Sequence, residues 1–219
     1  MDEIALQQKV SFNKTIIEET NWNQLWESNF DPVIVDDFVA VRADFHAPVK
    51  GVEHEIIVTP KMSFGTGHHA TTYMMIQQMR QIDFTGKTVL DFGTGTGVLA
   101  ILAEKLGAQK ITALDHDDWS IDNAGENISR NNCKLIRLKK ADTANVDNSC
   151  DIILANINKN VILDNFPVLV KQLAPGGILL LSGLLPGDQH DIFRKNDAYS
   201  LQLIQTTVRA NWLCIKLSR

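Results

Sequence analysis

A short glycine-rich segment, Asp91–Gly97 (DFGTGTG), carries the strongest chemical signal in this 219-residue chain. Glycines at alternate positions let the backbone turn sharply and let a ligand approach main-chain amides closely. A helix beginning after the segment would add free amides and a positive dipole end, which suit a phosphate or a carboxylate equally well. The segment also contains Gly95-x-Gly97-x-x-Ala100, a loose dinucleotide-binding pattern, so a nicotinamide oxidoreductase remains an alternative.

Two acidic residues follow the next two predicted strands. Asp115 ends the strand predicted over 110–114, where a carboxylate can accept hydrogen bonds from both hydroxyls of a ribose. Asp142 follows the strand predicted over 134–138 and can accept from the amino group of an adenine. Other aspartates lie beside both residues, so solvated loop acids are the alternative interpretation. We expect Asp115 to bind ribose and retain Asp142 as a candidate for adenine.

An amide and a second glycine loop complete the candidate site. Asn156 directly follows the buried strand predicted over 152–155, a place where an amide has no packing role. The loop Phe64–Thr72 (FGTGHHATT) precedes a predicted helix, and Thr71 and Thr72 at its start are also typical of a helix cap. The two adjacent histidines suggest a metal, but no further ligand follows at metal-binding spacing. We therefore expect no metal site.

The elements that must position these residues alternate between strands and helices from about residue 62. Such alternation produces right-handed crossovers and a parallel sheet. The last two strands leave no room for a helix between them and should form a hairpin. We therefore predict an α/β fold with a mostly parallel sheet, an antiparallel C-terminal edge strand, helices on both faces and a ligand beyond the carboxyl ends of the strands. Strands are expected over 88–92, 110–114, 134–138, 152–155, 178–182, 200–209 and 211–217, and helices over 70–81, 98–106, 120–131, 160–173 (kinked at Pro167) and 186–195.

The first 60 residues have a different pattern. A helix is predicted over 20–29, and short strands over 33–35, 38–42 and 55–59 are typical of a small antiparallel appendage. The predicted organisation is therefore an N-terminal appendage over 1–60 and a ligand-binding α/β domain over 61–219.

The composition and the net charge indicate which partners the chain can bind and in which cellular compartment it works. The chain has 21 Lys+Arg and 26 Asp+Glu, a net charge of −5, which argues against a broad nucleic-acid-binding face and suits a basic substrate. Three cysteines with wide spacing indicate a reducing compartment. Because no leader pattern opens the chain and no apolar run reaches the roughly 20 residues that span a bilayer, we expect a cytoplasmic protein without a membrane anchor.

Considered together, these segments resemble the class I S-adenosylmethionine-dependent methyltransferases, and within them the ribosomal protein L-eleven methyltransferase family. The resemblance covers nearly the whole chain and is carried by NWNQLWESNFDPV, MSFGTGHHATT, VLDFGTGTGVLAILAEKLGA, ALDHDD, LANIN, LAPGGILLLSGLL and a Trp in the last strand. It implies a Rossmann-like fold, S-adenosylmethionine as cofactor, and transfer of methyl groups to amines of a ribosomal protein of the large subunit. We expect a monomer without direct nucleic-acid binding, since the chain has no basic run. Family members usually carry an N-terminal recognition domain, for which the roughly 20 residues before Asn21 are too few.

The resemblance also assigns roles to residues. Positions that hold the cofactor match Thr72, Gly93, Asp115 and Asn156, with Gly95 in the same glycine loop, and the methyl-donor pocket would be covered by Phe64, Gly65, Thr66 and Gly67. Asn156 and Phe64 are the expected catalytic residues. The amide carbonyl can align an N–H of a neutral amine, and the ring can pack on a cationic sulfonium. A methyltransferase acting on RNA or a small molecule is the alternative from the same fold. A nicotinamide oxidoreductase is disfavoured because no Tyr-x-x-x-Lys pair is present.

Overall fold

The computed structural model describes residues 31–59, 65 and 67–219. The chain divides into two compact units, Met1–Asp31 and Pro32–Arg219, and every element below belongs to the second. The helix predicted over 20–29 lies outside the described residues. Within the described residues, no helix combines the length and apolar character needed to cross a membrane.

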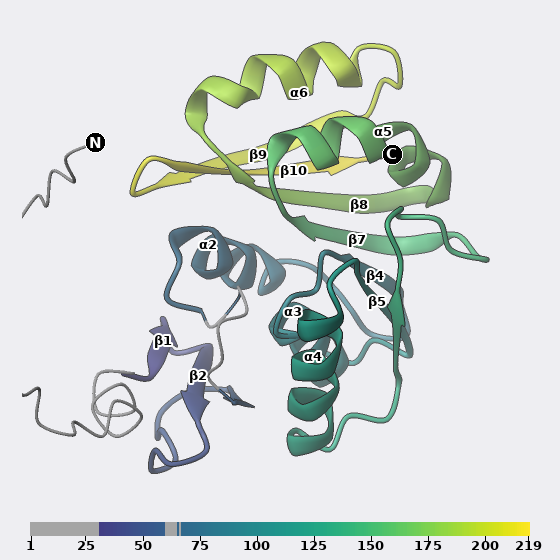
Figure 1. Ribbon diagram of the computed structural model, residues 1–219. Coiled ribbons are helices and arrows are strands. Elements are labelled where there is room, and N and C mark those ends of the chain that lie inside the picture. Colours follow the sequence, from purple (N-terminus) through teal and green to yellow (C-terminus); the bar gives the residue numbers. More distant parts are fainter. Residues whose placement is uncertain (1–30, 60–64, 66) are drawn as a thin grey trace, which may run out of the picture. The chain divides into compact units, whose positions relative to one another are not determined.

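The main sheet has seven strands in the order β6-β5-β4-β7-β8-β10-β9 (Figure 1). Strands β4 to β8 run parallel to one another, and β10 pairs antiparallel with both β8 and β9. This confirms the predicted α/β fold and its terminal hairpin, with the antiparallel C-terminal strand beside the outermost strand β9. The strands are β4 Thr88–Phe92, β5 Lys110–Asp115, β6 Ile136–Lys140, β7 Cys150–Asn156, β8 Leu173–Leu184, β9 Gln202–Arg209 and β10 Trp212–Ser218.

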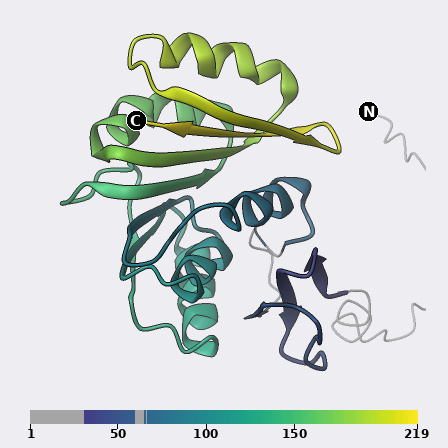
Figure 2. The ribbon, with the colours of Figure 1, turned by 180° about the vertical axis from the view of Figure 1, so that it is seen from behind.

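Helices cover both faces of this sheet, as predicted (Figures 1 and 2). The central strands β4 and β7 are therefore nearly continuous buried runs instead of alternating ones. One face carries α2 Ala70–Met79, α3 Val98–Lys105 and α4 Asp118–Arg130. The other face carries α5 Lys159–Gln172, which continues through Pro167, and α6 Gln189–Asn196, which follows the short 3-10 turn η1 Pro186–Asp188.

A separate three-stranded sheet precedes the main one and corrects one prediction. It consists of β1 Val33–Val35, β2 Val39–Ala43 and β3 His54–Val58. Strands β1 and β2 are antiparallel, but β2 and β3 are parallel, so an entirely antiparallel appendage was wrong. The buried Arg42 guanidinium donates to the carbonyl oxygens of Ala43 and His46 and to Glu55 Oε2 at 2.8 Å, which holds the segment that returns the chain to the start of β3.

The three short strands belong to the same compact unit as the main sheet. The side chain of Asn131, the C-cap of α4, accepts a hydrogen bond from the amide of Ile57 and donates one to its carbonyl. Unit Pro32–Arg219 therefore includes β1 to β3, and the boundary expected at residue 60 falls inside it.

Strand β8 is longer than predicted. The segment Pro175-Gly176-Gly177, which precedes the strand predicted over 178–182, lies inside β8, which begins with Leu173 paired to Cys150 and shifts register before Ile178. A Cβ on Gly177 would lie 2.9 Å from the carbonyl oxygen of Asp151. Glycine here therefore permits close contact between β8 and β7.

Candidate active site

A cavity of about 520 Å³ lies at the carboxyl ends of β4, β5 and β7. This is where ligands bind in open α/β sheets. Four residues predicted from the sequence line it together: Gly93, Gly95, Asp115 and Asn156. The other lining residues are His69, His116, Asp117, Ser120, Ile157, Asn158, Gly183 and Trp212.

The glycine loop between β4 and α3 uses most of its amides internally. The N–H groups of Gly93 and Thr94 both donate to the carbonyl of Leu114 at 2.8 Å, and that of Gly97 donates to Thr94. These amides are therefore not free to bind a phosphate, contrary to the first interpretation of the loop. Gly93 has a φ of 77°, and a Cβ there would lie 2.1 Å from Ile157 Cγ2. Glycine at this position serves the turn and the packing of Ile157.

Asp115, at the end of β5, supports the same loop. Its Oδ2 accepts from the amide of Gly95 at 2.9 Å, and its Oδ1 accepts from the amide of Asp117 at 3.1 Å. His116 Nδ1 lies 3.4 Å from Asp115 Oδ1. A carboxylate oxygen has more than one lone pair, so these contacts leave acceptor capacity toward the cavity. The expected ribose contact of Asp115 stays a prediction.

Asp91 is a second carboxylate beside the loop, and it is fully buried. Its Oδ2 accepts from the hydroxyl of Thr94 at 2.6 Å, and its Oδ1 has no partner among the described residues. Burial raises the pKa of Asp91 to about 7, against the opposing effect of the Thr94 hydrogen bond. The sequence motif contained this residue, but only its burial shows that it differs from an ordinary aspartate.

The electrostatics of the cavity favour a cation. Asp115 and Asp117 line it, and none of the described lining residues is a Lys or an Arg. A pyrophosphate would meet these carboxylates without a positive partner and with most loop amides already occupied. A ligand that carries an ammonium and a sulfonium would be attracted instead.

Asn156 and Thr72, both predicted to contact the cofactor, lie against each other although 84 positions separate them. Asn156 Nδ2 donates to Thr72 Oγ1 at 3.2 Å, and both side chains are buried. Asn156 Oδ1 is buried with no partner among the described residues. A buried hydrogen-bond acceptor without a donor lowers the stability of the fold unless a bound ligand supplies that donor.

The backbone of Asn156 is held by its close neighbours. The amide of Ile157 donates to the carbonyl of Ser182 at 3.2 Å, in register with the β7–β8 pairing. Gly183, with a φ of 80°, packs on the main chain of Ile157, where a Cβ would lie 2.2 Å from its carbonyl oxygen. Two glycines, Gly93 and Gly183, therefore contact Ile157 and fix the strand end that presents Asn156.

The remaining predicted site residues have different positions. The carbonyl of Gly65 accepts from Thr96 Oγ1 at 2.8 Å, which brings the second glycine loop to the first. Gly67 lies beside Val33, outside the 520 Å³ cavity, and Phe64 and Thr66 lie outside the described residues. Asp142 is exposed and does not line the cavity, so its adenine contact stays a prediction.

Two aromatic side chains in the cavity wall were not among the predicted site residues. His69 caps the N-terminus of α2, and its ring lies edge-on to Trp212, with 4.6 Å between ring centroids. From the sequence alone, His69 stands out only as one of two adjacent histidines and Trp212 only as a residue of the last strand. Their contact joins α2 to β10 and has no local sequence signal.

Comparisons with known proteins agree with this geometry. The sequence model of the family described as ribosomal protein L11 methyltransferase (PrmA) matches residues 1–219. A protein of that name from Porphyromonas gingivalis is 41% identical over 211 residues, covering 94% of this chain and 72% of the relative. One from Chlorobaculum tepidum is 38% identical over 209 residues, covering 92% and 72%. The solved structure of ribosomal protein L11 methylase from Lactobacillus delbrueckii subsp. bulgaricus superimposes with a TM-score of 0.80 at 30% identity, covering 87% of this chain and 99% of that one.

More distant solved structures share the fold alone. A 16S rRNA methyltransferase from T. thermophilus, in complex with AdoMet and guanosine, has a TM-score of 0.61 at 18% identity. The family match and the identities above confirm the resemblance predicted from the sequence motifs. The chain belongs to the ribosomal protein L11 methyltransferase family, whose members are class I methyltransferases that use S-adenosylmethionine.

Proposed function

We propose that this chain transfers methyl groups to amine nitrogens of ribosomal protein L11. The named relatives from Porphyromonas gingivalis and Chlorobaculum tepidum support the substrate, because the chain aligns with them over more than nine-tenths of its own length. The candidate active site supports the reaction class. The single observation that carries the proposal is the buried Oδ1 of Asn156 at the cavity, which has no partner in the part of the chain that the structure describes.

The residues around the cavity fit the family's cofactor. S-adenosylmethionine supplies, when bound, a methyl group on a positively charged sulfur. A lining with two carboxylates and no described Lys or Arg suits that charge. Asp115, the Gly93–Gly95 turn and the Thr72–Asn156 pair are the groups that would hold it.

The amide of Asn156 suits an amine acceptor. A lysine side chain with a pKa of about 10.4 is neutral in only about one molecule in 2,500 at pH 7, and only the neutral form has a free electron pair for methyl transfer. A carboxylate at this position would stabilise the ammonium form. Because Thr72 holds Nδ2, Asn156 presents its neutral carbonyl, which can accept an N–H and orient the nitrogen. Positioning of this kind supplies much of the rate in a displacement reaction.

The test is methylation of purified L11 with S-adenosylmethionine, followed by intact mass and peptide mapping. Asn156→Ala should lower the transfer rate about tenfold or more. Asn165→Ala is the matched control, because Asn165 is as buried as Asn156 (8% against 9% exposed) but bonds to Ala144 and Val161 on another part of the domain. Transfer to RNA with no transfer to L11 would contradict the proposed substrate.

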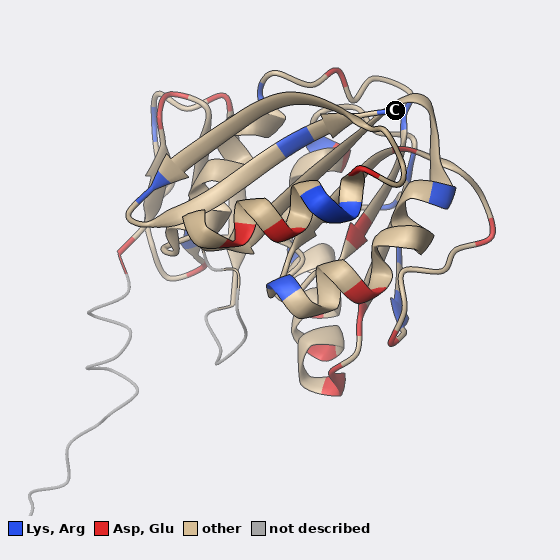
Figure 3. Cartoon of the chain, turned by 90° about the horizontal axis from the view of Figure 1, so that it is seen from above, with Lys and Arg blue, Asp and Glu red and all other residues tan. Residues whose placement is uncertain are grey.

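We also propose that the chain works as a cytoplasmic monomer without binding nucleic acid directly. The relatives are named for the methylation of a ribosomal protein, which supports the proposed cytoplasmic location. The net charge of −5 supports the absence of nucleic-acid contact, as does the mixing of acidic and basic positions along the described chain in Figure 3. Light scattering coupled to gel filtration and a salt-dependent RNA-binding assay test both parts.

A further inference from the structure

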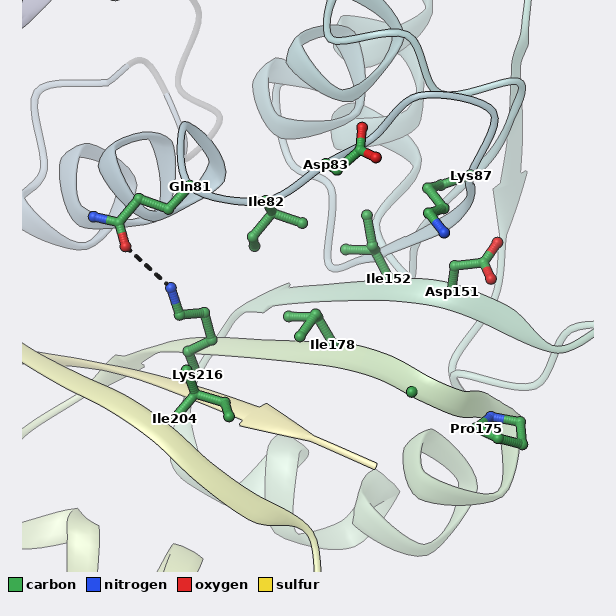
Figure 4. A pocket seen from close by; sticks show the side chains of 11 residues that line it. Gln81, Ile82, Asp83, Lys87, Asp151, Ile152, Pro175, Ile178, Ile204 and Lys216 are labelled. Carbon is green, nitrogen blue, oxygen red and sulfur yellow. Dashed lines mark hydrogen bonds between the residues drawn. The ribbon is translucent and has the colours of Figure 1, made fainter.

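A second cavity, of about 370 Å³, lies at the opposite end of the main sheet from the candidate active site. It is bounded by the segment after α2 and by the amino ends of β4, β7 and β8 (Figure 4). It shares no lining residue with the 520 Å³ cavity. Its volume falls in the range of small-molecule sites, so it can hold a ligand independently of methyl transfer.

A buried lysine at this cavity has no charged partner. Lys216 on β10 is only 6% exposed, and its Nζ donates to Gln81 Oε1 at 3.2 Å. Within residues 31–59, 65 and 67–219, no carboxylate forms an ion pair with it. An ammonium group has three donors, so one amide oxygen leaves most of its capacity unused. Burial lowers the pKa of Lys216, which reflects the same uncompensated charge. An anion in the cavity would remove that cost.

The cavity has polar side chains at both ends and apolar side chains between them. Ile82, Ile152 and Ile178 lie between Lys216 and the end that holds Lys87 and Asp151, as Figure 4 shows. The Oδ2 of that aspartate already accepts the amide of Thr88 at 2.8 Å. A ligand that places an anionic head at Lys216 would therefore lay an apolar body on the isoleucines.

We propose that this cavity binds a small aliphatic carboxylate, with its head group paired to Lys216 and its chain on Ile82, Ile152 and Ile178. A carboxylate of four to six carbons combines the two features that the lining offers. Lys216 would bind as a charged donor, and the isoleucines would bury the chain.

The experiment is an NMR titration of the full ¹⁵N-labelled chain with hexanoate, hexanamide and hexylamine. Hexanoate should produce saturable shifts at the amides of Ile152, Ile178 and Lys216, with an affinity at least about tenfold higher than that of hexanamide. Equal binding of hexanoate and hexanamide would overturn the proposal, as would stronger binding of hexylamine or the lack of saturable shifts at these amides.

Two variants assign the effect to one charge. Lys216→Met keeps a long side chain without the charge and should lower the affinity for hexanoate about tenfold, to that of hexanamide. Lys87→Met removes the other lysine of the cavity and should change the affinity less than about threefold. If Lys216→Met does not fold, the native chain decides: hexanoate should slow acetylation of Lys216 by acetic anhydride several-fold, read by peptide mass spectrometry. Unchanged acetylation at saturating hexanoate would refute the site.

Discussion

The side-chain amide of Asn127 donates to the carbonyl of Thr96, 2.9 Å away in the glycine loop. Its Oδ1 accepts from the amide of Thr59, the residue directly after β3, at 2.8 Å. The hydroxyl of Thr96 in turn donates to the carbonyl of Gly65. The side chains of Asn127 and Thr96 together therefore link the residues on both sides of 60–64 to the loop at the candidate active site.

Asn127→Asp should weaken the cofactor site through this link. The variant keeps an acceptor for Thr59 but replaces the donor to Thr96 with an oxygen that repels its carbonyl. We expect the affinity for S-adenosylhomocysteine to fall about tenfold, together with a loss of about 1–3 kcal/mol in the free energy of unfolding. Calorimetric titration and chemical denaturation measure the two effects separately.

The matched control is Asn131→Asp, at the C-cap of α4 and four positions after Asn127. Asn131 donates to the carbonyls of Ile57 and Asn127 and does not contact the glycine loop. It should lose comparable stability while the affinity for S-adenosylhomocysteine changes less than about threefold. Equal loss of affinity in both variants would show that α4 acts only through general stability.

Asp91 should make both stability and cofactor binding depend on pH. Its folded pKa of about 7 lies above the ordinary 3.8, so between these values the folded chain binds more protons than the unfolded chain. The free energy of unfolding should therefore fall as pH rises from about 4 to about 7, by up to about 4 kcal/mol. A cationic cofactor favours the ionised carboxylate, so its affinity should rise between pH 6 and pH 8.

The Asp91→Asn variant distinguishes the pH dependence caused by Asp91 from that caused by other titratable groups. The amide oxygen can still accept from Thr94, but nothing at this position titrates. The variant should be more stable than the native chain at pH 8 and should bind S-adenosylmethionine, which carries the positive charge, more weakly and with a flatter pH profile. Thermal melts and calorimetry from pH 5 to pH 8 test this, and an unaltered affinity profile in the variant would exclude Asp91 as its source.

Asp115→Asn should weaken the cofactor site in two ways. It removes the negative charge from the cavity, and an amide cannot accept from both Gly95 and Asp117 in the present geometry. We expect a loss of about 1.5–3 kcal/mol in binding of S-adenosylhomocysteine, the range for hydrogen bonds to a charged group. Asp118→Asn is the control, since that exposed carboxylate pairs with Lys140. Affinities within error of each other for Asp115→Asn and the native chain would place the ribose elsewhere.

The sequence predicted elements well wherever one local pattern determined them. Strand β4 has the predicted bounds Thr88–Phe92 because a buried parallel strand is a continuous apolar run between turn residues. The direction of β3 could not be predicted in this way, because Arg42 and Asn131 hold that strand and no local pattern encodes their contacts. The same reason explains which residues of the candidate site could be predicted from the sequence and which could not. Strand ends identified Asp115 and Asn156, whereas the contacts of Asn127 and of His69 with Trp212 join distant segments.

Asn156→Asp should lower the rate of methyl transfer much more than cofactor affinity. The new carboxylate can still accept from the hydroxyl of Thr72, so the side chain should keep its place. A negative charge beside the acceptor amine would raise the pKa of that amine, and each unit means about tenfold less neutral nucleophile at a given pH. A carboxylate with an ordinary pKa near 4 is a poor base for an ammonium, so this effect should outweigh any gain from base catalysis. The deficit should therefore shrink as pH rises toward the pKa of the amine, whereas a folding defect would not recover. Steady-state rates from pH 7 to pH 10 decide the matter: a variant profile parallel to the native one, at nearly equal rates, would remove Asn156 from the role of orienting the amine.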